Sequence, residues 1–145
     1  IRLGIWNNYY TFTIARNPWD MVVSTYFYRK NKNNENIPFE DFIHQRKLYN
    51  NYDLYTINDK VIVDKVCKLE NMSDDLKTIK QKLGLNKSIN LPKAKSGLRE
   101  KKHYSTYYNE DLKNIIRNKY IREINLLEYS FKNKDNQQKK YVEKI

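Results

Sequence analysis

Two side chains eight residues apart, Arg16 and Ser24, could together hold a phosphate group. A guanidinium binds phosphate through two parallel hydrogen bonds, and a hydroxyl can add a third. Asn17 and Pro18 follow Arg16 directly, and these residue types are favoured at the N-cap and at the first position of a helix. The spacing therefore predicts an anion site at the N-terminus of a helix that begins at Pro18. The alternative is a surface arginine beside an ordinary helix.

The residues around Arg16 predict a strand, a sharp turn and a helix. Residues 10–15 are β-branched or aromatic apart from Ala15, which is typical of a buried strand. The helix is expected from Pro18 to about Arg29, with Asp20 in its first turn, where a negative charge is favourable. Arg16 then lies at the carboxyl end of the strand, the position where ligands bind in open α/β sheets.

The segment from Phe12 to Tyr26 resembles the 3′-phosphate-binding motif of sulfotransferases that use 3′-phosphoadenosine-5′-phosphosulfate (PAPS). In that family an arginine, and a serine eight residues later, bind the 3′-phosphate of the nucleotide, and Arg16 and Ser24 match both positions. The likeness is closest to the carbohydrate sulfotransferase branch. That branch usually has a second arginine where this chain has Met21.

Further segments along the chain are similar to the same family. Residues 62–71 resemble its second core strand, which typically ends in Glu-Asn. A helix is predicted over residues 74–83, capped by Ser73 and stopped by Gly84. Family members carry a comparable helix and glycine, followed by a Leu-Pro and a basic loop.

The last part of the likeness is a tyrosine-rich segment before a helix. Tyr104, Tyr107 and Tyr108 precede a helix expected over residues 110–127, as in the family's C-terminal part. We expect these tyrosines to pack in the core or at its rim rather than to stack on adenine. The likeness as a whole covers residues 1–131, the expected sulfotransferase domain, and leaves residues 132–145 as a polar, charged tail.

A second group of candidate nucleotide ligands lies in the basic loop. The resemblance implies that Lys95, Ser96, Gly97 and Arg99 close over the same 3′-phosphate as Arg16 and Ser24. The family branch often has asparagine at the position of Lys95. The alternative for this loop is a solvated basic turn.

The resemblance implies a fold, a reaction and a set of partners. The fold is α/β and helix-rich, similar to P-loop NTPases, with a parallel sheet flanked by helices. The reaction is transfer of a sulfuryl group from PAPS, the donor, to an acceptor hydroxyl, expected on a carbohydrate, with 3′,5′-ADP as the product. The expected partners are the nucleotide donor and a glycan acceptor.

The family's other phosphate-binding loop has no counterpart in this sequence. Its only glycines are Gly4, Gly84 and Gly97, and none lies between a predicted strand and helix beside Lys, Ser or Thr. We therefore expect the fold to be incomplete and the chain to be the C-terminal part of a longer sulfotransferase, which supplies the 3′-phosphate-binding half. The alternative is a catalytically inactive nucleotide-binding remnant. No catalytic base is assigned, because His44 and His103 both follow the Arg16 motif, whereas the family's base usually precedes it.

A net charge of +11 and a pI near 9.6 raise the third alternative, a basic nucleic-acid-binding protein. The lysines are mostly scattered along the sequence, and no helix-turn-helix, zinc-finger or RNA-recognition pattern is present, so no specific nucleic acid is expected. Abundant Asn, Lys, Ile and Tyr would also follow from an A+T-rich coding sequence.

Cysteine content and hydropathy set the remaining expectations. Cys67 is the only cysteine, so no cysteine-based metal site is expected, and its place in a predicted strand favours a buried position. No stretch approaches the ~20 apolar residues of a membrane span. The compartment stays open: the Golgi lumen for an animal-type member with an N-terminal anchor outside this chain, otherwise the cytoplasm.

Overall fold

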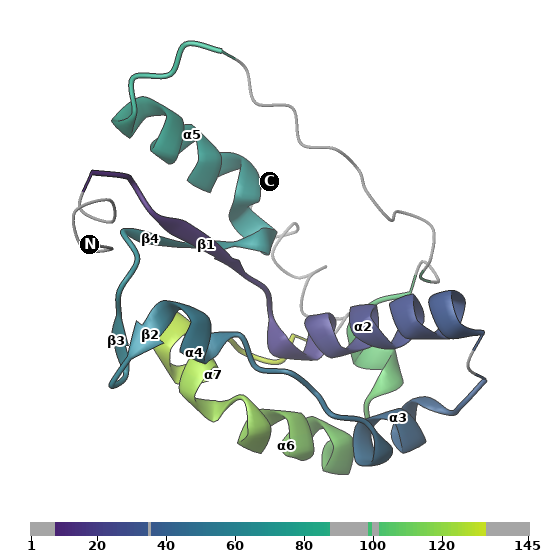
Figure 1. The fold of residues 1–145 in the computed structure, drawn as a ribbon. Helices are drawn as coiled ribbons and strands as arrows, with labels where there is room; N and C mark the ends of the chain where they lie inside the picture. The colour runs from purple at the N-terminus through teal and green to yellow at the C-terminus, as the bar shows by residue number, and fades with distance from the viewer. Residues whose placement is uncertain (1–7, 35, 88–98, 100–101, 133–145) are drawn as a thin grey trace, which may run out of the picture. The chain divides into compact units, whose positions relative to one another are not determined.

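The computed structural model describes residues 8–34, 36–87, 99 and 102–132, which form two compact units. The first unit comprises Ile1–Arg16 and Asn50–Pro92, and the second comprises Asn17–Tyr49 and Lys93–Ile145. The described residues are helix-rich and include a small parallel sheet, as expected for an α/β chain (Figure 1). Among them, no helix has the length and apolar character needed to cross a membrane.

The sheet of the first unit joins two strands that are distant in sequence. Strand β1 (Phe12–Ala15) pairs in parallel with β4 (Lys65–Lys68), with Ile14 opposite Cys67. Helix α5 (Met72–Lys82) packs on β4 (Figure 1). Cys67 of β4 is buried in a cluster with Met72 and Ile79 of this helix. The parallel pairing and the burial of Cys67 are confirmed.

The expectation that β1 is buried is wrong for two of its apolar residues. Phe12 is 45% exposed and Ile14 is 49% exposed. Residues in register on neighbouring parallel strands share a face, so Ile14 lies on the same face as Cys67. Cys67 is fully buried, so α5 covers this face of the sheet at β4. Much of the same face at β1 remains exposed to solvent.

The rest of the first unit contains short elements that the sequence did not reveal. Helix α4 (Tyr52–Tyr55) and a hairpin of β2 (Thr56–Ile57) and β3 (Lys60–Val61) precede β4 in the sequence. Asn58 and Asp59 form the hairpin turn with positive φ angles of 49° and 60°, a conformation that these residue types tolerate.

The segment after β4 differs from its prediction only at the boundaries. A short 3-10 turn, η1 (Leu69–Asn71), follows the strand, and α5 begins at Met72, two residues earlier than expected. Its N-cap is Asn71, without a side-chain hydrogen bond, so Ser73 is not the cap. The predicted stop is confirmed, because Gly84 has a φ of +63° just after the helix.

The second unit is built around helix α2 (Pro18–Asn33). The Asn17 cap and the start at Pro18 are confirmed. The expected helix end at about Arg29 is wrong, because the helix continues to Asn33 and is followed by Asn34 at a φ of 51°. Lysine is a good helix former, and its charge is favourable near a helix C-terminus, which explains the extension.

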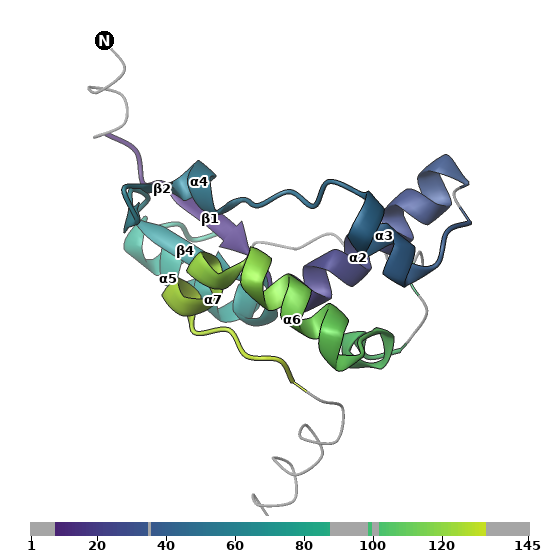
Figure 2. The ribbon, with the colours of Figure 1, turned by 90° about the horizontal axis from the view of Figure 1, so that it is seen from below.

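The remaining elements of the second unit are α3 (Phe39–Gln45), η2 (Tyr104–Tyr107), α6 (Glu110–Lys119) and α7 (Ile121–Leu127). Three of them contact α2, and the fourth, α7, contacts α6. Helices α3 and α6 both contact α2 (Figure 2). The single helix predicted over residues 110–127 is interrupted at Tyr120, where φ is −109°.

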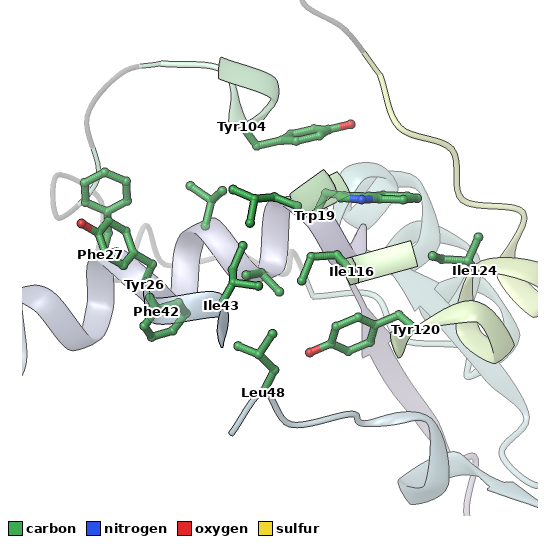
Figure 3. Close-up of a cluster of buried hydrophobic side chains, with 13 residues drawn as sticks. Trp19, Tyr26, Phe27, Phe42, Ile43, Leu48, Tyr104, Ile116, Tyr120 and Ile124 are labelled. Atoms are coloured by element: carbon green, nitrogen blue, oxygen red, sulfur yellow. The ribbon is translucent and has the colours of Figure 1, made fainter. Parts of the chain in front are cut away.

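The core of the second unit is rich in aromatic side chains (Figure 3). Tyr26 makes edge-on ring contacts with Phe27 and Phe42, at centroid distances of 5.1 and 5.4 Å. Ile116 and Tyr120 close the core from the α6 side and are almost fully buried. Trp19 and Tyr26 thus pack α2 into a core that it forms with the other helices of the second unit.

Candidate functional site

The strand–turn–helix expected around Arg16 is confirmed. Strand β1 ends at Ala15 and α2 begins at Pro18, so only Arg16 and Asn17 separate them. The side chain of Asn17 accepts a hydrogen bond from the backbone N–H of Trp19 at 3.2 Å. Asn17 thus caps the first turn of α2, which follows Arg16 in the sequence and whose backbone N–H groups favour a nearby anion.

The two principal candidate ligands belong to different compact units. Arg16 is half-buried and ends the first segment of the first unit. Ser24 is half-buried on α2 in the second unit. Their joint binding of one phosphate therefore remains a prediction.

Arg99 has a specific place in the second unit. Its Nη1 forms an ion pair with the carboxylate of Asp20, and its Nη2 donates to the carbonyl oxygen of Lys102 at 3.0 Å. The side chains of Arg99 and Asp20 are only 23% and 21% exposed. The structure thus brings Arg99 to the first turn of α2. The other predicted ligands of this loop, Lys95, Ser96 and Gly97, lie outside the described residues.

The aromatic residues near this turn are structural, as expected. Trp19 is buried, and its indole N–H donates to the carbonyl oxygen of Lys113 at 3.0 Å. The hydroxyl of Tyr108 donates to the carbonyl oxygen of Trp19 at 2.8 Å, and burial raises the pKa of Tyr108 well above its usual value. Tyr104 is buried in the same core. These side chains hold the start of α2 against the core of the second unit.

Neither histidine gains an obvious catalytic environment. His44 is exposed on α3. The Nδ1 atom of His103 lies 2.8 Å from the Ser105 hydroxyl oxygen and accepts from the Ser105 N–H at 3.3 Å, so this ring caps η2. Within the described ranges, no cluster of three or more His, Cys, Asp or Glu side chains could hold a metal ion.

A pocket of about 480 Å³ in the second unit was not foreseen from the sequence. It is lined by residues of α6 and α7 and by the segment that follows α7, together with Trp19. All of its lining residues except Trp19 lie between positions 113 and 131, but they form no sequence motif, so only the packing of the helices reveals the pocket.

Comparison with known proteins gives one informative match. No protein-family model matches this sequence, and no solved structure matches it. An uncharacterized protein of Archaeoglobus fulgidus is 33% identical over 93 residues, which make up 60% of this chain and 78% of the archaeal protein. This chain therefore belongs to the same family as that archaeal protein.

Proposed function

We propose that this chain is the 3′-phosphate-binding part of a PAPS-dependent sulfotransferase with a P-loop-like fold. The observation that carries the proposal is the junction of β1 and α2. Arg16 directly follows a strand that is paired in parallel, and Asn17 caps the helix that begins at Pro18. A guanidinium next to the N-terminus of a capped helix is chemically suited to a phosphate group.

In this proposal Arg16 is the main ligand of the 3′-phosphate and Ser24 adds a hydroxyl. Arg99 contributes a third ligand and a second positive charge, because its ion pair with Asp20 keeps it at the first turn of α2. The nearby carboxylate of Asp20 offsets part of that positive charge. Arg16 is thus expected to contribute more to nucleotide affinity than Arg99.

The reaction would be an in-line transfer. The oxygen of an acceptor hydroxyl, expected on a carbohydrate, attacks sulfur and forms a new S–O bond. The bond between sulfur and the 5′-phosphate oxygen breaks, 3′,5′-ADP leaves, and a general base accepts the hydroxyl proton. Neither His44 nor His103 is assigned as this base.

Calorimetric titration with 3′,5′-ADP and with 5′-AMP tests the proposal directly, since the two nucleotides differ by the 3′-phosphate. We expect the chain to bind 3′,5′-ADP more tightly, and Arg16→Ala to remove this preference. Charged hydrogen bonds contribute about 1.5–3 kcal/mol, so the affinity should fall by roughly ten- to a hundredfold. Lys119→Gln is the matched control, because it removes one positive charge from an exposed position on α6.

Equal affinity of the folded chain for both nucleotides would contradict the proposal, as would an unchanged preference in Arg16→Ala. A nucleic-acid-binding protein would instead bind oligonucleotides with a steep salt dependence and ignore an isolated 3′-phosphate. Specific binding of 3′,5′-ADP without sulfuryl transfer by the complete protein would identify an inactive nucleotide-binding remnant.

A further inference from the structure

The pocket of the second unit has an apolar wall. Phe131 and Trp19 line it, with their rings in an edge-on contact at a centroid distance of 5.5 Å. Ile124, which is buried in the core, adds an aliphatic surface. Side chains of this kind bind the flat apolar body of a small molecule, and about 480 Å³ is within the range of small-molecule pockets.

Two basic residues from consecutive turns of α6 line the same pocket. The ammonium of Lys113 is 3.1 Å from the Glu110 carboxylate and lies 5.1 Å from the centre of the Phe131 ring. Lys113 is thus held by groups of its own unit. Arg117 lies four residues further along α6 and is exposed at the pocket.

Arg117 is the lining residue best placed to bind an anion. Within the described part of the chain its side chain has no ion pair or hydrogen bond, and a guanidinium can hold a sulfate, carboxylate or phosphate through two hydrogen bonds. Asn125 and Glu128 also line the pocket and offer hydrogen-bonding groups to other polar atoms of a ligand. The negative charge of Glu128 favours a ligand with a single anionic group over a polyanion.

We propose that this pocket binds a small organic anion that consists of a flat apolar ring with one anionic group. The ring packs against Phe131 and Ile124, and the anionic group binds the guanidinium of Arg117. None of the lining residues is a proposed nucleotide ligand, so this site stands independently of the proposed sulfotransferase function.

Tryptophan fluorescence of the 145-residue chain provides a local signal, because Trp19 lines the pocket. The sequence has one other tryptophan, Trp6, and Trp6→Phe leaves Trp19 as the sole reporter. We expect phenyl sulfate to change the Trp19 emission in a saturable manner. Inorganic sulfate at the same ionic strength should produce no saturable change, and neutral benzyl alcohol should bind at least about tenfold more weakly, because it lacks the charged contact.

Substitutions on α6 test the anion contact. In the Trp6→Phe background, Arg117→Gln should weaken phenyl sulfate binding by about tenfold or more. Lys119→Gln removes the same charge from the same helix outside the pocket and should leave binding unchanged. Both positions are exposed, and glutamine suits a helix, so both variants should remain folded, as circular dichroism would verify.

Three results would overturn the inference. They are the absence of a saturable response to phenyl sulfate, equal binding of phenyl sulfate and benzyl alcohol, and equal effects of Arg117→Gln and Lys119→Gln. Arg16→Ala should leave phenyl sulfate binding unchanged, so failure of this site and failure of the nucleotide site give different patterns.

Discussion

Asn17 and Ser130, which lie 113 positions apart in the sequence, are joined by a hydrogen bond of 3.0 Å from the Asn17 amide to the Ser130 carbonyl oxygen. The other end of the same amide accepts from the Trp19 N–H and caps α2. One buried side chain thus fixes the start of α2 and holds the segment after α7 on the second unit.

Asn17→Ala should destabilise the second unit by about 1–3 kcal/mol, because it removes both the helix cap and the hydrogen bond to the Ser130 carbonyl oxygen. Asn17→Ser should cost less, since a serine hydroxyl can still cap the helix but does not reach Ser130. Denaturant unfolding followed by Trp19 fluorescence in the Trp6→Phe background measures both. Equal stabilities of the serine variant and the unmodified chain would show that the bond to Ser130 contributes nothing.

Tyr108 should make the second unit sensitive to alkaline pH. Burial raises the pKa of its hydroxyl above the usual value of 10.0, so the folded unit keeps the proton while the unfolded chain loses it. The stabilising effect is complete below pH 10 and declines above it, by about 1.4 kcal/mol per pH unit for this group. Tyr108→Phe removes the hydrogen bond to Trp19 and should cost about 1 kcal/mol at pH 7.

The Tyr108→Phe variant has no ionisable group at position 108. Its stability deficit should therefore shrink above pH 10 and reverse about one pH unit higher. Denaturant unfolding of the two proteins between pH 8 and pH 11 tests this expectation. A constant difference over that range would contradict it.

Asp64 should contribute to the stability of the first unit at neutral pH but not in acid. Its carboxylate accepts hydrogen bonds from the backbone N–H of Thr11 at 2.7 Å and from the Thr11 hydroxyl at 2.8 Å. The backbone bond is the main reason that the pKa of Asp64 lies below its usual 3.8, and the hydroxyl bond adds to the effect. The stabilisation is complete well above pH 3.8 and is lost as the pH falls through the folded-state pKa.

Asp64→Asn replaces the carboxyl group with an amide that does not ionise. The stability difference between the variant and the unmodified chain should therefore decrease from pH 6 to pH 3. Urea unfolding followed by circular dichroism at the two pH values measures the change, and a difference that grows in acid would exclude this role for Asp64.

The parts of the structure that the sequence predicts are those with local causes. Asn17 and Pro18 specify the start of α2 through backbone geometry within one turn, and Gly84 specifies the end of α5 in the same way. The apolar runs in β1 and β4 predict two strands, which the structure pairs in parallel. Each of these signals lies within a few residues of the element that it defines.

The predictions failed where packing between distant segments decides the outcome. The predicted helix over residues 110–127 is interrupted at Tyr120, whose buried hydroxyl donates to the carbonyl oxygen of Tyr49 at 2.8 Å, 71 positions away. The ion pair of Asp20 and Arg99 spans 79 positions and has no counterpart in any local pattern. The candidate site follows the same distinction. The sequence predicts Arg16 and Ser24 as ligands, and the structure adds the ion pair between Arg99 and Asp20.

Ser24 should contribute less to nucleotide binding than Arg16. A neutral hydroxyl contributes about 1 kcal/mol, so Ser24→Ala should reduce the affinity for 3′,5′-ADP by roughly fivefold and leave 5′-AMP binding unchanged. Alanine is a better helix former than serine, and the stability of α2 should not fall. Titration calorimetry gives the affinities, and an equal loss for both nucleotides would contradict a contact with the 3′-phosphate.

Variants of the Asp20–Arg99 ion pair can separate the effect of Arg99 on nucleotide binding from its effect on the stability of the second unit. Both side chains are less than a quarter exposed, so a double-mutant cycle of Asp20→Asn and Arg99→Gln should give a coupling energy of about 1 kcal/mol in the stability of the second unit. Denaturant unfolding measures this quantity.

Nucleotide binding distinguishes direct contact from positioning. Arg99→Gln removes the guanidinium. If this group contacts the 3′-phosphate directly, the variant should weaken 3′,5′-ADP binding by several-fold and leave 5′-AMP binding unchanged. Asp20→Asn retains the guanidinium and removes a competing carboxylate, and it should not weaken binding of either nucleotide. If both variants weaken 3′,5′-ADP binding equally, Arg99 acts through Asp20 by fixing the first turn of α2, and the direct contact with phosphate is excluded.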